Sequence, residues 1–320
     1  RVVGAFSSHG KFETLRAGYS QLTRPGAEAP RLAHECAMIY TDRYEYEAAV
    51  AALERAESGF ARRGDTDGTA KVQLQRARIE LQQGQNHAAI ELAEGIADSA
   101  QPELRGGALR VIGLAYTRLG EVAEGVAYLE EAVACYRSAH LVSALSHLLQ
   151  DLQFAYTRLG RLEQAGACLQ EVVALRRRLS GPIALSLALN NLGYYYHQKN
   201  DYLQALATFE EGLGIIAGVP NRLAETSLLW SLGDLKRDLA LFDEAERLYT
   251  RALGLLPPGA EPNLRSAVLI SSAALRRCER RPEEAVLMAH EALEVANRHG
   301  PRARRAGDGA RRAARAGRAV

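Results

Sequence analysis

The hexapeptide AYTRLG occurs twice, at residues 115–120 and 155–160, so the two copies lie 40 residues apart. Each copy belongs to a longer stretch that recurs with the same period, at residues 113–133, 153–173, 193–213, 233–253 and, in a more divergent form, 273–293. Within each stretch, apolar and small residues recur three or four positions apart, interrupted once by a short polar turn. This pattern predicts two amphipathic helices joined by a tight link. A fixed period indicates an array of such pairs, because one pair cannot bury its apolar face alone.

Small residues mark the places where helices are expected to cross. Gly113, Gly193 and Gly233 recur midway along the first helix of a pair, and Leu129, Phe209 and Tyr249 recur on the second. A glycine allows two helix backbones to approach closely, and the large side chain fills the remaining space. The second helices also carry an alanine in phase, at positions 165, 205, 245 and 285. Gly120 and Gly160 follow the first helix, where a left-handed cap favours glycine.

These anchors resemble the tetratricopeptide repeat, whose pattern is W/L-x2-L-G-x2-Y followed by A-x3-F/Y-x2-A. Residues 189–196, LNNLGYYY, and residues 205–212, ALATFEEG, match nearly every anchor. Residues 228–235, LLWSLGDL, and residues 245–253, AERLYTRAL, also match, although Lys236 replaces the usual tyrosine. The usual period of this family is about 34 residues. The period of 40 therefore predicts a longer second helix or a longer link to the next pair.

The resemblance implies an all-α fold, a right-handed α-solenoid of about seven helix-turn-helix pairs plus an N-terminal half repeat. We expect one domain over residues 1–299, with the half repeat at 1–24 and repeats starting near residues 30, 70, 106, 146, 186, 226 and 266. Residues 300–320 are rich in arginine, alanine and glycine and carry seven arginines against one acid, Asp308. This composition predicts a disordered tail that makes no specific nucleic-acid contact.

Composition and cysteine usage restrict the class of protein. Hydrophobic residues make up 47% of the chain and aromatic residues 6%, and no apolar run approaches the length of a membrane span. The four cysteines are scattered without a CxxC pair, which predicts reduced, mostly buried thiols and a cytoplasmic location. Only four of the 40 basic residues are lysine, a bias that favours a bacterial source. The chain begins with arginine, and we expect it to be part of a larger protein.

No catalytic or metal-binding pattern stands out. The chain contains no GxSxG or HExxH motif, and the residues around Gly10 and Lys11 lack the spacing of a phosphate loop. The eight histidines show no ligand spacing; His140 and His147 lie seven residues apart, which favours a solvated pair over a metal site. We therefore expect no enzyme activity, no cofactor and no metal.

The resemblance also implies where a ligand would bind. In the tetratricopeptide family, the first helix of each pair lines a concave groove, and ligand contacts come from repeat positions 2, 5, 6, 9, 12 and 13. Asn191 is at position 6, where many members carry an asparagine that holds a peptide backbone. The candidate binding residues are Arg110, Arg118, His147, Gln150, Asp151, Phe154, Arg158, Asn190, Asn191, Tyr194, His197, Trp230, Asp234 and Arg237.

Repeats of about 40 residues resemble the helical-repeat sensor domains of large ATP-dependent bacterial transcriptional activators. The resemblance implies a non-catalytic module that senses a ligand or partner for transcription regulation or signalling. A protein or peptide segment is the expected partner, with a small-molecule inducer such as an oligosaccharide as the lesser alternative. A stand-alone protein-protein adaptor or scaffold is the second interpretation, and an enzyme with a site in the groove is the third. An ATPase module or a DNA-binding module in the full-length protein would separate the first two.

Overall fold

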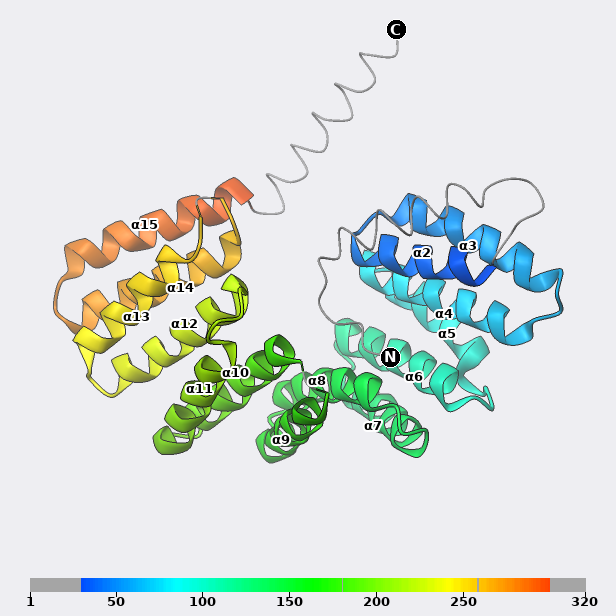
Figure 1. Cartoon of the computed structure of the whole chain (residues 1–320), viewed down its shortest axis with the longest axis horizontal. Coiled ribbons are helices and arrows are strands. Elements are labelled where there is room, and N and C mark those ends of the chain that lie inside the picture. Colours follow the sequence, from blue (N-terminus) through cyan, green and yellow to red (C-terminus); the bar gives the residue numbers. More distant parts are fainter. Residues whose placement is uncertain (1–29, 180, 258, 300–320) are drawn as a thin grey trace, which may run out of the picture. The chain divides into compact units, whose positions relative to one another are not determined.

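The computed structural model describes residues 30–179, 181–257 and 259–299, and within these ranges the chain forms only α-helices. First and second helices of a pair alternate along the chain (Figure 1). The first helices are α2 (Pro30–Asp42), α4 (Thr66–Gln83), α6 (Pro102–Leu119), α8 (Val142–Arg158), α10 (Pro182–Gln198), α12 (Arg222–Asp238) and α14 (Pro262–Cys278). The second helices are α3 (Tyr46–Ala61), α5 (Asn86–Ala97), α7 (Val122–Ser138), α9 (Leu162–Arg178), α11 (Tyr202–Ile216), α13 (Phe242–Gly254) and α15 (Pro282–His299). The predicted all-α helical-repeat fold with seven pairs is confirmed. The predicted half repeat at 1–24 and the tail at 300–320 lie outside the described residues.

The predicted period is visible in the helix boundaries. From α6 onward, each first helix and each second helix begins 40 residues after the preceding one, whereas α4 begins 36 residues before α6. From α4 onward, the first helices begin four residues ahead of the predicted repeat starts, for example at Pro102 instead of residue 106, whereas α2 begins at the predicted residue 30. Part of the extra length therefore lies at the N-terminal end of the first helix, whereas the prediction assigned it to the second helix or the following link.

The chain divides into two compact units, residues 1–175 and 176–320, and the division falls within α9. Within each unit, neighbouring first helices approach to Cα–Cα distances of 8 Å or less: α2, α4, α6 and α8 in unit 1, and α10, α12 and α14 in unit 2. The second-helix pairs α3–α5, α5–α7, α11–α13 and α13–α15 show no such approach. The first-helix face is therefore the inner, more closely packed side of each unit. That residues 1–299 act as one domain stays a prediction.

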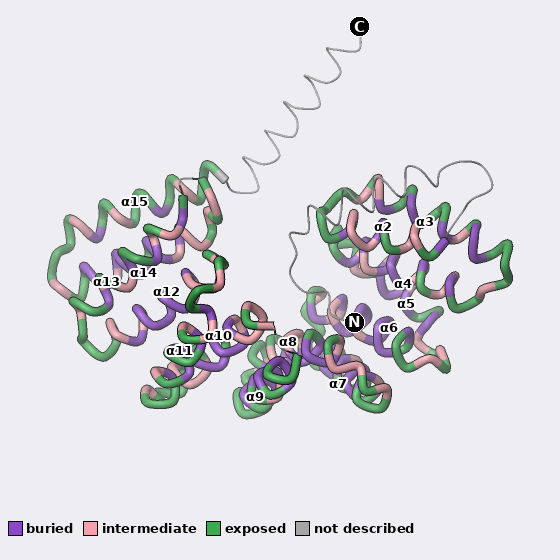
Figure 2. Tube along the Cα trace, in the orientation of Figure 1, coloured by how far each residue is buried: buried purple, intermediate pink, exposed green. Residues whose placement is uncertain are grey.

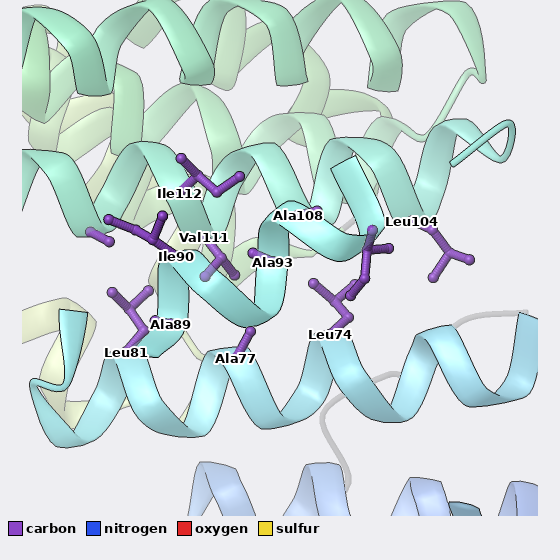
Figure 3. Packing of buried hydrophobic residues seen from close by; sticks show 12 residues of the cluster. Leu74, Ala77, Leu81, Ala89, Ile90, Ala93, Leu104, Ala108, Val111 and Ile112 are labelled. Carbon is purple, nitrogen blue, oxygen red and sulfur yellow. The ribbon is translucent and has the colours of Figure 1, made fainter. Parts of the chain in front are cut away.

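Aliphatic and small side chains fill the space between the helices of unit 1. A buried cluster joins α4, α5 and α6 and includes Leu74, Ala93, Leu104 and Ile112 (Figure 3). Figure 2 shows that buried residues follow the facing sides of neighbouring helices, while the turns are largely exposed. Alanine recurs in these contacts because its single methyl group lets helix backbones approach without leaving a void.

The predicted glycine contacts are present. A Cβ atom built on Gly193 would lie 2.6 Å from Cε1 of Phe209, and one built on Gly233 would lie 2.6 Å from Cε1 of Tyr249. Gly113 is confined by backbone as well, since its Cβ would lie 2.8 Å from the carbonyl oxygen of Gly125. The first helices α6, α10 and α12 therefore each cross the following second helix at a position that has no room for a side chain.

The links between first and second helices share one backbone feature. Each contains a residue with positive φ: Tyr44 (61°), Gly84 (83°), Gly120 (100°), Gly160 (72°), Asn200 (60°), Ala240 (59°) and Arg280 (60°). The prediction of left-handed glycine at Gly120 and Gly160 is confirmed. Ala240 and Arg280 adopt the same conformation with a Cβ atom, which is unfavourable for L-residues.

The four cysteines are free thiols with different exposure. Cys36 and Cys168 are buried, Cys135 is partly buried, and Cys278 is exposed. Burial raises the pKa of the Cys168 thiol to about 11. The expectation of mostly buried thiols thus holds for two of the four, because Cys278 lies at the last position of α14, where no helix covers it.

Candidate functional site

The candidate binding residues all lie on the first helices α6, α8, α10 and α12, so they belong to the first-helix faces of the two units. Unit 1 contains the seven candidates from Arg110 to Arg158, and unit 2 contains the seven from Asn190 to Arg237. Two rows of polar contacts between neighbouring first helices account for about half of them.

The first row joins position 5 of one repeat to position 6 of the next. The Arg110 Nε donates to Oδ2 of Asp151 at 2.6 Å, and both side chains are half-buried. In unit 2, the indole Nε1 of Trp230 donates to Oγ of Ser271 at 2.8 Å. Both contacts link residues that are 41 positions apart, one more than the period. Arg110, Asp151 and Trp230 were predicted to face a ligand, and they also join one repeat to its neighbour.

The second row joins position 13 to position 12 of the preceding repeat. Nη1 of Arg118 donates to the carbonyl oxygen of Leu81, and Nη1 of Arg158 donates to that of Thr117. These carbonyls lie in the last turns of α4 and α6, where a helix leaves its C=O groups without an internal partner. The guanidinium groups therefore act as caps on the preceding first helix.

In unit 2 the same row consists of side chains. Nε2 of His197 lies 3.0 Å from Oδ2 of Asp238, again 41 residues away. Asp238 Oδ1 in turn accepts from Arg237 Nε at 2.9 Å. The histidine at the end of α10 is thus connected to the last turn of α12.

Asp234 connects this row to the second helix α13. Its Oδ1 accepts from Arg237 Nη1 at 2.9 Å and from the hydroxyl of Tyr249 at 2.6 Å. Burial and the Asp234 carboxylate raise the pKa of Tyr249. The Tyr249 ring of α13 lies against Gly233 of α12, and this position lets its hydroxyl reach Asp234 on the first helix. Arg237 is therefore paired with two carboxylates and is not a free cation of the inner face.

Three large apolar side chains on inner faces remain open to solvent. Phe154 is 60% exposed on α8, Tyr194 is 49% exposed on α10, and Ile270 is 58% exposed on α14. Trp230 on α12 is half-buried. Tyr194, Trp230 and Ile270 belong to unit 2, whereas Phe154 belongs to unit 1. The expectation that Phe154, Tyr194 and Trp230 line one stretch of groove stays a prediction.

The two asparagines of α10 differ in environment. Asn191, the predicted backbone-holding amide, is exposed. Asn190 is half-buried, and its Oδ1 is fully buried without a hydrogen-bond partner among the described residues. A buried acceptor without a donor costs free energy, so a ligand that donates to Asn190 Oδ1 would remove that cost.

The remaining candidates lie on α8. His147 is exposed and Gln150 is half-buried, and both take part in polar contacts with their surroundings. Over the described ranges, no group of three His, Cys, Asp or Glu side chains could hold a metal ion. Within the same ranges, no helix combines the length and hydropathy that a membrane span requires.

Sequence reasoning did not include Ile270 among the candidates. Ile270 follows Trp230 by one period, so shifting a known position by 40 residues could have found it.

Comparison with known proteins supports this architecture. Tetratricopeptide-repeat family models match residues 106–140, 149–217 and 184–257. No curated protein sequence matches the chain.

Three solved structures show the same fold. A Signal Transduction ATPase with Numerous Domains (STAND) protein with a tetratricopeptide repeat sensor from Pyrococcus horikoshii is 13% identical with a TM-score of 0.67, and the match covers 93% of this chain and 48% of that one. The apo form of the quorum sensor NprR from B. thuringiensis is 14% identical with a TM-score of 0.62, over 84% of this chain and 76% of that one. The apo form of RapI is 14% identical with a TM-score of 0.59, over 84% of this chain and 97% of that one. The chain therefore carries tetratricopeptide repeats over residues 106–140 and 149–257, and its other described helix pairs have the same helical-repeat fold.

Proposed function

We propose that the chain is a non-catalytic sensing module of a larger bacterial regulatory protein, and that the first-helix face of unit 2 holds an extended peptide segment of a partner. The observation that carries this proposal is a row at position 5 of three consecutive repeats. It consists of Asn190, Trp230 and Ile270, spaced 40 residues apart, with Tyr194 one helical turn beyond Asn190.

Each member of this row suits one part of an extended peptide. The buried Oδ1 of Asn190 lacks a donor, and a peptide N–H would supply one. Tyr194 and Ile270 are about half exposed and offer apolar contact area to side chains of the peptide. Aromatic residues at such positions are frequent anchors of protein interfaces. Together these residues would recognise the peptide main chain at Asn190 and apolar side chains of the peptide at Tyr194 and Ile270.

The charges of this face favour a neutral or basic segment. Arg237 is paired with Asp234 and Asp238, so the three side chains together carry one net negative charge. An acidic peptide would have to displace these carboxylates from the arginine. Arg237, one of the candidate binding residues, would therefore orient the two aspartates instead of receiving a ligand carboxylate.

The sensor role draws support from the structural neighbours. One is described as a STAND protein with a tetratricopeptide repeat sensor and another as a quorum sensor. A cytoplasmic location fits such a role. A stand-alone adaptor or scaffold is the second candidate, and an oligosaccharide inducer on Tyr194 and Trp230 is the lesser alternative to a peptide. An ATPase or DNA-binding module in the full-length protein would favour the sensor over the adaptor.

Trp230 is the only tryptophan, so its fluorescence reports on this face directly. Peptides selected from a random dodecamer library on the immobilised chain would be titrated while its emission is recorded. We expect saturable shifts, and we expect Tyr194→Ala and Asn190→Leu to weaken binding by about 1–3 kcal/mol, as central anchors do. Selected peptides should be neutral or basic.

Leu203→Ala is the matched control, because Leu203 is 83% exposed on the second helix α11. It should leave the titration unchanged. If Leu203→Ala abolishes binding while Tyr194→Ala and Asn190→Leu do not, the second-helix side is the working surface and the proposal is wrong.

A further inference from the structure

The last described helix, α15, carries an apolar stripe that is open to solvent. Val286 is 55% exposed and Leu293 is 57% exposed, and they share one face because seven residues make about two helical turns. Two alanines on the same face are also exposed (Figure 2). We call this set the α15 stripe: Val286, Ala289, Leu293 and Ala296. The end of a helical-repeat array is normally closed by a polar outer face, so an apolar end face calls for a partner.

The equivalent positions of earlier repeats face the following helix pair. One repeat earlier, Tyr249 belongs to a buried cluster that includes Val268 of the next first helix, and Leu253 packs against this cluster. Two repeats earlier, Ile216 is buried in a cluster with Leu228 of the next first helix. The α15 stripe is therefore the face on which this fold stacks another helix.

The residues that follow α15 in this chain lack the side chains to cover the stripe. Residues 300–320 contain no Leu, Ile, Met, Phe, Tyr or Trp, and Val320 is their single valine. By contrast, the first helix α12 buries Leu228 and Leu229 completely. The occupant that fits the stripe is a helix from another molecule with an apolar face of its own.

The stripe is complementary in shape to itself. Large and small side chains alternate along it in the order Val286, Ala289, Leu293 and Ala296. If two copies of α15 pack antiparallel around residue 291, Val286 of one copy opposes Ala296 of the other, and Ala289 opposes Leu293. Each large side chain then meets a small one, so the helices can approach closely without leaving a void.

The charges at the two ends of α15 favour the same arrangement. Glu283 lies in the first turn, and no Lys, Arg or His nitrogen of the described residues lies within 4.0 Å of its carboxylate. Arg298 near the other end is 72% exposed and pairs with Glu294 of its own helix at 2.8 Å. An antiparallel pair brings Arg298 of one copy close to Glu283 of the other, whereas a parallel pair would place Glu283 beside Glu283.

We propose that the α15 stripe is the contact surface of a homodimer, in which α15 of a second copy packs antiparallel against it. The same surface is used by both copies, as in a two-fold symmetric dimer. One helix per copy makes a small interface, so we expect a dissociation constant of about 10–100 µM. The stripe is separate from the first-helix face proposed to hold a peptide, so Tyr194→Ala should leave the association unchanged.

Sedimentation velocity of the full chain tests the proposal. With increasing concentration, the mean mass should rise from that of one chain, 34.8 kDa, toward twice that value. Leu293→Arg should weaken the association about tenfold or more, because it buries an unpaired charge in the interface. The matched control is Leu287→Arg, which adds the same charge to the same helix at a side chain that is 69% exposed. Leu287 lies roughly 100–120° around the helix axis from Val286 and Leu293, so this variant should associate as the wild type does.

A charge exchange tests the antiparallel arrangement. Glu283→Arg and Arg298→Glu should each weaken the association about two- to fivefold, because each change places like charges opposite each other at an exposed rim. Both changes combined in one chain exchange the two charges, and the affinity should return to nearly that of the wild type. Circular dichroism should show the same helical content for all variants.

A mean mass that stays at that of one chain at every concentration would overturn the proposal. If Leu293→Arg then lowered the melting temperature, the stripe would be covered from within the same chain, and if it did not, the stripe would belong to a different protein. An equal loss of association in Leu293→Arg and Leu287→Arg would indicate an effect of net charge alone and would also contradict the proposal. A charge exchange that does not recover the affinity would exclude the antiparallel pair.

Discussion

Replacing Gly193 by alanine tests the helix crossing in unit 2 most directly. The new Cβ would lie 2.6, 2.7 and 3.0 Å from Cε1, Cδ1 and Cζ of Phe209, whereas carbon atoms make favourable contact at about 3.5–4.0 Å. Phe209 is fully buried, so its ring cannot turn out to solvent. Overpacking of this kind costs about 1–3 kcal/mol. The better helix propensity of alanine returns about 1 kcal/mol, which leaves a net loss of about 0–2 kcal/mol.

A double-mutant cycle separates these two contributions. Phe209→Leu shortens the obstructing side chain and copies the Gly113–Leu129 contact found in α6 and α7. Alone it should destabilise unit 2 by roughly 1–2 kcal/mol because it leaves a void. Combined with Gly193→Ala, the void accepts the new methyl group, so the double variant should be more stable than the sum of the singles by at least about 1 kcal/mol. Urea unfolding followed by Trp230 emission reads the stability of unit 2.

Gly214→Ala is the control, because a Cβ at Gly214 of α11 would meet no atom within 4 Å. It should stabilise unit 2 by up to about 1 kcal/mol through propensity alone. Additive effects of Gly193→Ala and Phe209→Leu, within about 0.5 kcal/mol, would show that the two residues are not in contact and would refute the crossing.

Three further predictions follow from single residues. Ala240→Gly should increase the free energy of unfolding by roughly 0.5–1 kcal/mol, because it removes a Cβ from a residue in the left-handed conformation. The melting temperature should rise accordingly, and an unchanged thermal melt would contradict this. Thr226→Val should stabilise unit 2 by about 1 kcal/mol in urea unfolding, because the Thr226 hydroxyl is buried without a partner; a loss of stability would show that the hydroxyl is satisfied. Timed alkylation at pH 8 followed by mass spectrometry should modify the exposed Cys278 first, since a pKa of about 11 leaves roughly one Cys168 in a thousand as thiolate. Early modification of Cys168 would mean that α9 opens readily.

Much of the fold could be predicted because it depends on local, repeated features. The 40-residue period, the close approach at Gly193 and the left-handed cap at Gly120 each follow from residue type and spacing within one pair. These features need no knowledge of the neighbouring repeat. The helix starts were predicted less accurately. From α4 onward, the first helices begin four residues before the first position of the family pattern, and the pattern carries no information about those residues.

The candidate site could be predicted only as a face. The family positions indicate which side chains of a first helix point inward, but they do not indicate which of them bond to the next helix. The contacts of Arg110 and Trp230 connect residues 41 positions apart, so the offset of one residue depends on how successive helices are rotated.

The two rows of contacts between neighbouring first helices bear on how such a chain can evolve. Repeat proteins grow and shrink when whole units are duplicated or lost. Loss of residues 222–261 would keep the 40-residue phase and the glycine crossings intact. It would nevertheless bring Cys278 to the place where His197 now meets Asp238. The contacts that join two side chains, unlike those of Arg118 and Arg158 to carbonyl oxygens, therefore make a repeat specific for its neighbour. A unit that is moved or deleted would fit the shape of the stack while losing these hydrogen-bonding partners.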